Sequence, residues 1–91
     1  MPTTIQHRPE QQRFEATADG GRGRLDYRSS PGVMKLVHTE VDPALEGHGV
    51  AAQLVQAALD HARAQGLKVD PACEYARSYM ERHPETLALH V

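Results

Sequence analysis

Cysteine, tryptophan and long apolar runs are scarce or missing in this 91-residue sequence. A single cysteine, Cys73, excludes an internal disulfide and suits a reducing compartment, so we expect a cytoplasmic protein. No apolar run approaches the roughly 18 residues of a membrane-spanning helix, and the polar start shows no signal-peptide pattern, so we expect no membrane partner. The six histidines are scattered without zinc-ligand spacing, so the sequence predicts no metal.

The sequence also lacks a large excess of charge of either sign. Ten basic and twelve acidic residues give a net charge of −2, and the basic residues form no block. Phosphate-binding surfaces are usually rich in Lys and Arg, so this composition argues against nucleic acid as the main partner. With 40% hydrophobic residues, the chain can fold as one domain. The sequence shows no apolar surface beyond what the core needs, so we expect a monomer.

The N-terminal half consists of short strand patterns joined by turns. Residues 1–11 are polar and contain two prolines, so we expect a flexible leader there and a domain over 12–91. Residues 13–18 and 23–28 alternate between apolar and polar side chains, which predicts two strands. The Asp-Gly-Gly between them favours a hairpin, because glycine accepts the positive φ that such turns need.

A third strand is predicted over residues 33–41, after a Ser-Ser-Pro-Gly turn. Met34 and Leu36 point one way and three valines point the other, which is typical of a central strand covered on both sides. By the same alternation, His38 and Glu40 fall on the Met34/Leu36 face. Two interpretations stay open, because this polar end of the face either enters a cleft or is an ordinary solvated strand end.

A glycine-rich stretch, Val-Asp-Pro-Ala-Leu-Glu-Gly-His-Gly-Val-Ala-Ala over residues 41–52, follows this strand and leads into the longest helical pattern, 49–65. Gly47 and Gly49 lack Cβ atoms, so the backbone can turn its N–H groups towards a ligand. The helix start adds partial positive charge, which favours an anion. The alternative is a plain tight turn, since short glycine motifs also occur by chance.

The remaining chain completes an α+β domain. Gly66 is the expected end of the helix, and residues 67–70 predict a strand that pairs parallel with the third strand after the helical crossover. A second helix is predicted over 73–82, and Pro84 ends it. Residues 85–91 are expected to dock as an extended edge piece. The sheet is therefore mixed, with antiparallel N-terminal strands, one parallel β-α-β crossover and two main helices.

Several short motifs follow one another along residues 5–86. They are Arg13-Phe14, Leu25-Asp26-Tyr27-Arg28, His38-Thr39-Glu40-Val41, Glu46-Gly47-His48-Gly49-Val50-Ala51, Gly66-Leu67-Lys68-Val69, Cys73 and His83-Pro84-Glu85. In this register the chain resembles the general-control-type N-acetyltransferase superfamily (GNAT), and more closely its very small, stand-alone members. The family's coenzyme A loop has the form Gln/Arg-x-x-Gly-x-Gly/Ala, which the motif at residues 46–51 matches except at its first position.

The resemblance implies acetyl-CoA as cosubstrate. In the family, the loop amides and the helix start hold the pyrophosphate, and the pantetheine arm pairs with the central strand as a mock extra strand. The cofactor-binding residues implied here are Thr39, Val41, Glu46, Gly47, His48, Gly49, Val50, Ala51 and Ala52. Glu46 replaces the family's Gln or Arg, and we expect its carboxylate to face solvent while the backbone binds the ligand.

The family's usual general acid is missing. Larger members have Asn-x-x-Ala-x-x-x-Tyr after the last core strand, and the corresponding tyrosine position here is Met80, which cannot donate a proton. Tyr75 and Tyr79 are either substitutes or core residues. His38 and Glu40 are candidate bases for the amine, or His38 has a purely structural role. Cys73 is the remaining candidate for a catalytic residue.

Cys73 follows a strand and begins a helix, a position that favours the thiolate. It is expected to form an acyl-cysteine, to donate a proton, or only to fill space beside the cofactor.

The function implied by the resemblance is N-acetyl transfer from acetyl-CoA to an unidentified amine. A chain this short leaves a shallow acceptor site, which suits a lysine on a protein surface or a small polyamine. The alternative is a non-catalytic coenzyme A-binding or protein-interaction module that keeps the fold.

Overall fold

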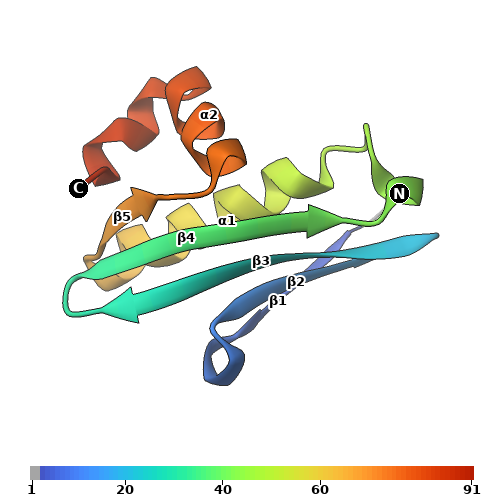
Figure 1. The fold of residues 1–91 in the computed structure, drawn as a ribbon, viewed down its shortest axis with the longest axis horizontal. Coiled ribbons are helices and arrows are strands. Elements are labelled where there is room, and N and C mark those ends of the chain that lie inside the picture. Colours follow the sequence, from blue (N-terminus) through green and yellow to red (C-terminus); the bar gives the residue numbers. More distant parts are fainter. Residues whose placement is uncertain (1–2) are drawn as a thin grey trace.

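A computed structural model describes residues 3–91 and contains one five-stranded sheet with two main helices (Figure 1). The strands lie side by side in chain order, antiparallel at the first three junctions and parallel at the last. They are β1 (Thr4–Arg8), β2 (Arg13–Ala18), β3 (Gly21–Ser30), β4 (Val33–Val41) and β5 (Lys68–Pro71); the helices are α1 (Val50–Gln65) and α2 (Glu74–Arg82). The predicted α+β fold with one parallel crossover is confirmed.

The helices cover one face of the sheet. Buried side chains of α1 pack on alternate strand residues such as Leu25, Leu36 and Val69, and three residues of α2 join the same core. Figure 1 shows α1 behind the sheet, with the opposite face towards the viewer. No element of residues 3–91 covers that open face, where Val37 is 39% exposed. The prediction that β4 is covered on both sides is therefore wrong.

A β-bulge in β4 changes which side chains reach each face. Asp26 pairs with His38, but the next residue of β3, Tyr27, pairs with Leu36, so Val37 is an extra residue in β4. One extra residue reverses the alternation beyond it. His38 and Glu40 therefore lie on the open face, and the prediction that they share the Met34/Leu36 face is wrong.

The N-terminal segment is part of the sheet rather than a loose leader. Thr4–Arg8 forms β1 and pairs with five of the six residues of β2, from Arg13 to Thr17. His7 stacks on Phe14 with ring centroids 4.2 Å apart and shares a hydrogen bond with the buried Tyr27. Side-chain contacts thus order the segment that two prolines and polar composition suggested was flexible. Residues 1–2 of the predicted leader lie outside the described part of the chain.

The C-terminal segment is mostly a 3-10 helix, η3 (Pro84–Leu89), rather than the predicted extended edge piece. Thr86 is buried, and its hydroxyl donates to the carbonyl of His83 at 2.7 Å. Only a single bridge, between Val69 and His90, extends the sheet here. Gly66 ends α1 in the left-handed conformation, with φ of 70°, as the sequence predicts. Among residues 3–91 no helix is both long and apolar enough to cross a bilayer.

Candidate active site

The turn between β4 and α1 depends on two glycines. After the short 3-10 helix η2 (Pro43–Leu45), Gly47 has φ of 83° and Gly49 has φ of 77°, both in the left-handed region that other residues rarely adopt. A Cβ built at either position meets no atom within 4 Å. Glycine is needed here for its backbone conformation, not because space is short.

The first turn of α1 keeps its N–H groups available. The first helical hydrogen bond runs from Gln53 N to Gly49 O at 3.0 Å, so the N–H groups of residues 49–52 have no partner within the helix. No side chain of residues 3–91 caps this end. Uncapped N–H groups and the helix dipole together favour a bound anion such as a phosphate.

A hollow of about 460 Å³ opens at this turn. Its lining residues are Val41, Leu45, Glu46, Gly47, Gly49, Val50, Ala51 and Tyr75. Six of the nine predicted cofactor residues are among them. The other three are Thr39, which lies further back along β4, His48, which is exposed, and Ala52, which packs on the core. Glu46 is exposed at the rim, so its carboxylate can reach solvent.

Cys73 lies where β4 and β5 part. Its N–H donates to Leu36 O at 2.8 Å, and its Sγ lies 3.5 Å from Thr39 Oγ1. Burial is the largest influence on the pKa of the Cys73 thiol and raises it. Hydrogen bonds from the Thr39 hydroxyl and from the backbone N–H groups of Ala76, Tyr75 and Thr39 outweigh burial together, so the pKa is below the usual value. These hydrogen bonds favour the thiolate form of Cys73.

The edge of β4 beyond this point has no strand partner among residues 3–91. The pairing with β5 ends at Leu36 and Pro71, where the chain turns into α2, while β4 runs on to Val41 beside β3 alone. Residues 39–41 therefore offer backbone groups between Cys73 and the glycine turn. An extended ligand with amide groups can pair there as an added strand.

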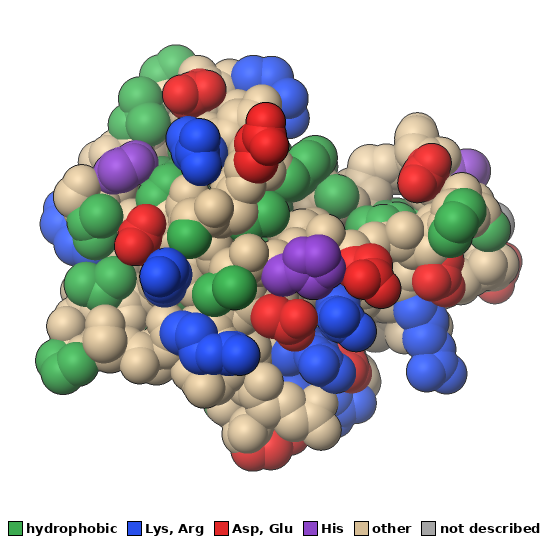
Figure 2. All heavy atoms as spheres, viewed as in Figure 1, with side chains coloured by type: hydrophobic (Ala, Val, Ile, Leu, Met, Phe, Trp, Pro, Cys, Tyr) green, Lys and Arg blue, Asp and Glu red, His purple; other side chains and the backbone are tan. Residues whose placement is uncertain are grey.

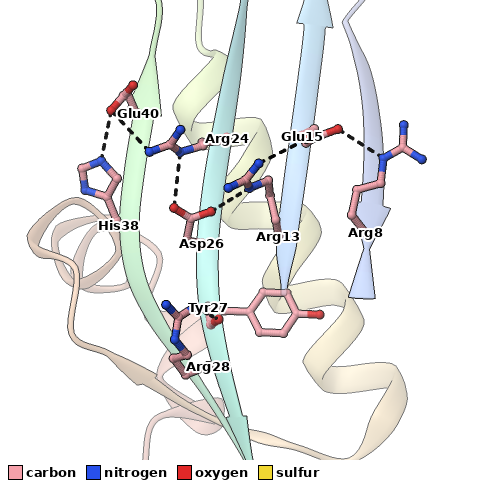
Figure 3. A network of polar contacts seen from close by, with 9 residues as sticks. All are labelled: Arg8, Arg13, Glu15, Arg24, Asp26, Tyr27, Arg28, His38 and Glu40. Carbon is pink, nitrogen blue, oxygen red and sulfur yellow. Dashed lines mark hydrogen bonds and ion pairs between the residues drawn. The ribbon is translucent and has the colours of Figure 1, made fainter. Parts of the chain in front are cut away.

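His38 and Glu40 form a separate pair on the open face. His38 Nε2 lies 3.3 Å from Glu40 Oε1, and Glu40 lies 3.8 Å from Arg24 Nη2 (Figure 3). Glu40 borders a second hollow of about 380 Å³ over the arginines of β1 to β3. The structure thus joins Thr39 with Cys73 and His38 with Glu40, but on opposite faces of β4.

The tyrosines of α2 divide into one core residue and one site residue. Tyr79 is buried, donates to Gln56 on α1 and stacks on His83 with centroids 4.0 Å apart. Met80 is buried in the core. Tyr75 lines the hollow at the glycine turn, a position that helical spacing alone did not reveal.

The fold and site together define a domain of the acetyltransferase type, with a mixed sheet, a glycine turn and an uncapped helix start. The family model for GCN5-related N-acetyl-transferases matches residues 13–89, so the chain belongs to that family. Protein NATD1 of Mus musculus is 30% identical over 86 residues, which cover 91% of this chain and 78% of that protein. Protein NATD1 of Homo sapiens is also 30% identical over 86 residues, covering 91% and 76%.

Two solved structures share the fold. The NMR solution structure of a GCN5-like candidate N-acetyltransferase from Staphylococcus aureus has a TM-score of 0.75 and 24% identity, covering 97% of this chain and 87% of that one. The crystal structure of a Trypanosoma brucei acetyltransferase has a TM-score of 0.55 and 16% identity, covering 84% and 63%. At these identities the likeness concerns the fold alone.

Proposed function

We propose that this protein is an acetyl-CoA-dependent N-acetyltransferase that acts on an unidentified amine. The observation that carries the proposal is a continuous path along one edge of β4. It runs from the uncapped start of α1, past the outer edge of residues 39–41, to the Cys73 thiol, whose pKa is lowered. A ligand with a phosphate at one end, amides in the middle and a thioester at the other fits these three features in order.

The residues present suit such a cosubstrate. The N–H groups of residues 49–52 would hold the pyrophosphate without a basic side chain. Thr39 and Val41 would pair with the pantetheine amides, and the thioester would then lie near Cys73. Bound acetyl-CoA supplies the activated acetyl group.

The transfer itself requires balanced movement of protons. The amine nitrogen attacks the thioester carbonyl, the carbon–sulfur bond breaks, and its electron pair stays on the coenzyme sulfur. The amine loses a proton and the thiolate gains one. Tyr75 and Cys73 are the candidate donors nearest the hollow. His38 and Glu40 are candidate acceptors, provided the amine arrives from the open face.

A second route uses Cys73 as a nucleophile. Its thiolate would attack the thioester, the carbon–sulfur bond to the coenzyme would break, and the coenzyme thiolate would take a proton. The amine would then attack the acyl-cysteine, the carbon–sulfur bond to Cys73 would break, and the nitrogen would lose a proton as the Cys73 thiolate is regenerated. The lowered thiol pKa supports this route as well as direct transfer.

A non-catalytic coenzyme A-binding module is the other candidate. The observation that favours it is the loss of the usual acid, because Met80 is core and the neighbouring Tyr79 hydroxyl is already engaged by Gln56. This candidate predicts binding of acetyl-CoA without transfer to any amine.

Calorimetry with acetyl-CoA tests the proposal first. Gly49→Val should abolish binding, whereas Gly32→Val is a matched control, because Gly32 has φ of 76° and equally open surroundings but lies in the remote β3–β4 turn. Absence of binding heat at millimolar acetyl-CoA would rule out both candidates.

Labelled acetyl transfer to mixed amines then separates the acetyltransferase from the non-catalytic module. The variants Cys73→Ala, His38→Ala and Tyr75→Phe show which side chain the chemistry requires.

A further inference from the structure

The open face of the sheet concentrates positive charge on an acidic protein. The strand register places seven of the ten basic residues there, namely Arg8, Arg13, Arg22, Arg24, Arg28, Lys35 and Lys68. Four of the twelve acidic residues accompany them, namely Glu15, Asp26, Glu40 and Asp70. This face therefore carries a net charge of +3, while the three basic and eight acidic residues elsewhere give −5. Figure 2 looks onto this face and shows Lys and Arg side chains spread across it.

Most of the carboxylates on the face are already engaged. Ion pairs link Glu15 with Arg8 at 3.2 Å and Asp26 with Arg13 at 2.9 Å, and Arg24 contacts both Asp26 and Glu40 (Figure 3). These pairs form one chain of alternating charge that runs from β1 to β4. Their net field at a distance is small, because each cation lies beside an anion.

Three of the four basic residues outside this chain, Arg28, Lys35 and Lys68, lie towards β5, whereas Arg22 lies opposite Thr17 at the other end of β3. Within residues 3–91, Arg22, Arg28, Lys35 and Lys68 form no ion pair. Arg28 and Lys35 are register partners on β3 and β4, and both are exposed. Asp70 on β5 is the other register partner of Lys35 but forms no ion pair with it within residues 3–91. Like charges directly opposite each other on a sheet repel, so this basic pair gains from an anionic partner.

The basic pair stands close to the candidate bases. Lys35 is three residues before His38 on the same strand and face, a separation of about 10 Å in an extended chain. His38 in turn adjoins Thr39, which contacts Cys73 from the other face. An extended peptide along β4 can therefore contact Arg28 and Lys35 at one end and present an amine beside His38 and Glu40 at the other.

We propose that the acceptor is a lysine within an acidic polypeptide segment, which docks along β4 on the open face. Carboxylates three or four residues from the lysine contact Arg28 and Lys35. This inference rests on the proposed N-acetyltransferase function and names the class of its acceptor. A small polyamine fits less well, because a face of net charge +3 repels a free polycation.

Nucleic acid also fits less well than an acidic peptide. The aromatic side chains Phe14 and Tyr27 are buried on the covered face, so among the described residues the open face offers no Phe or Tyr ring for base stacking, and its imidazole, His38, is engaged by Glu40. The charge of −5 over the rest of the molecule repels a long polyanion, whereas a short acidic segment meets only the basic pair.

Matched lysine peptides test the proposal. One carries Glu three and four residues from a single lysine, and the other carries Gln at the same positions. Fluorescence anisotropy measures docking without acetyl-CoA, and labelled acetyl transfer measures kcat/KM. We expect the acidic peptide to be favoured about tenfold at low salt in both measurements, and the contrast to shrink as salt rises.

Two double variants locate the effect. Arg28→Gln/Lys35→Gln should remove the contrast between the peptides. Arg63→Gln/Arg77→Gln makes the same change in net charge on exposed helical residues and should keep it. Equal kcat/KM for both peptides, equal effects of the two double variants, faster acetylation of spermidine, or tighter binding of an oligonucleotide would overturn the proposal.

The two measurements also separate this inference from the proposed function. Docking with the expected contrast but without transfer to any amine would leave the acidic-peptide surface standing and refute the acetyltransferase. Transfer to amines without any contrast would leave the acetyltransferase standing and refute the acidic acceptor.

Discussion

On the covered face of the sheet, Leu25, Leu36 and Val69 are fully buried, whereas no charged side chain of the open face is. The covered face is constrained by packing against α1, so the side chains at its centre are apolar and tightly placed. The open face has no such constraint and carries eleven charged residues. The difference shows that a single bulge at Val37 decides which chemistry β4 offers on each side.

Insertion of one alanine between His38 and Thr39 should break this comparison most severely. One further residue reverses the alternation beyond it, so Glu40 would turn towards the covered face, where an unpaired carboxylate costs several kcal/mol. We expect the insertion to remove most of the folding stability, which is about 5–15 kcal/mol for a typical domain. Urea denaturation followed by circular dichroism measures the loss. Val37→Ala keeps the bulge and should stay within about 0.5 kcal/mol of the parent; equal stability of parent and insertion would refute the assignment of the two faces.

Truncation of one side chain on each face gives the next largest effect. Leu36→Ala leaves a cavity beneath α1 and should cost about 2–5 kcal/mol. Arg24→Gln removes exposed ion pairs with Asp26 and Glu40 and should cost about 1 kcal/mol or less. Urea midpoints of the two variants are compared. Similar losses would mean that the charged chain, rather than the core, holds the sheet together.

Thr39→Val tests the covered face near the thiol. Removing the hydroxyl that hydrogen-bonds to Cys73 should raise the thiol pKa and slow alkylation near neutral pH. The rate of reaction with iodoacetamide across pH gives the apparent pKa directly. Thr17→Val, an exposed threonine on β2, is the control and should leave the profile unchanged. A profile that Thr39→Val does not move would show that the helix N–H groups alone support the thiolate.

The smallest effect is a pH dependence at the edge of the covered face. Burial, and next the nearby His61 charge, lower the pKa of His7, while Glu10 opposes them. Because the unfolded chain binds this proton more tightly, stability is full above a pH of about 6.5 and falls as pH drops below it. His7→Gln should flatten this part of the urea-midpoint profile, and His61→Gln should flatten it partly. An unchanged slope in His7→Gln would assign the dependence to other groups.

The predictable parts of the fold are those that local chemistry dictates. Gly47, Gly49 and Gly66 mark left-handed positions, and the apolar stripe of α1 has a helical period, so the turn and the helix follow from the sequence. The bulge at Val37 does not, because valine suits a regular strand equally well. The strand over residues 33–41 was therefore predicted correctly, but the faces on which His38 and Glu40 lie were not.

Long-range contacts account for the other differences. Strand β1 has few apolar residues, and it is ordered by the stack of His7 on Phe14 and its contact with His61 on α1, which no local pattern reveals. Tyr75 likewise joins the candidate site only because α2 folds back beside the glycine turn. Residues 85–91 alternate like a strand, but Pro84 and the buried Thr86 hydroxyl favour a 3-10 helix.

The parallel junction between β4 and β5 also has a kinetic meaning. Strands β1 to β4 are joined by short turns, so they can assemble early by local closure, whereas β5 must wait for α1 to cross over. Cys73 and the unpaired edge of β4 lie beside this β4–β5 junction, which forms late. Amide hydrogens of β5 and of the Cys73 bond to Leu36 should therefore exchange with solvent sooner than those between β2 and β3. The candidate site would then be the part of the molecule that opens without global unfolding.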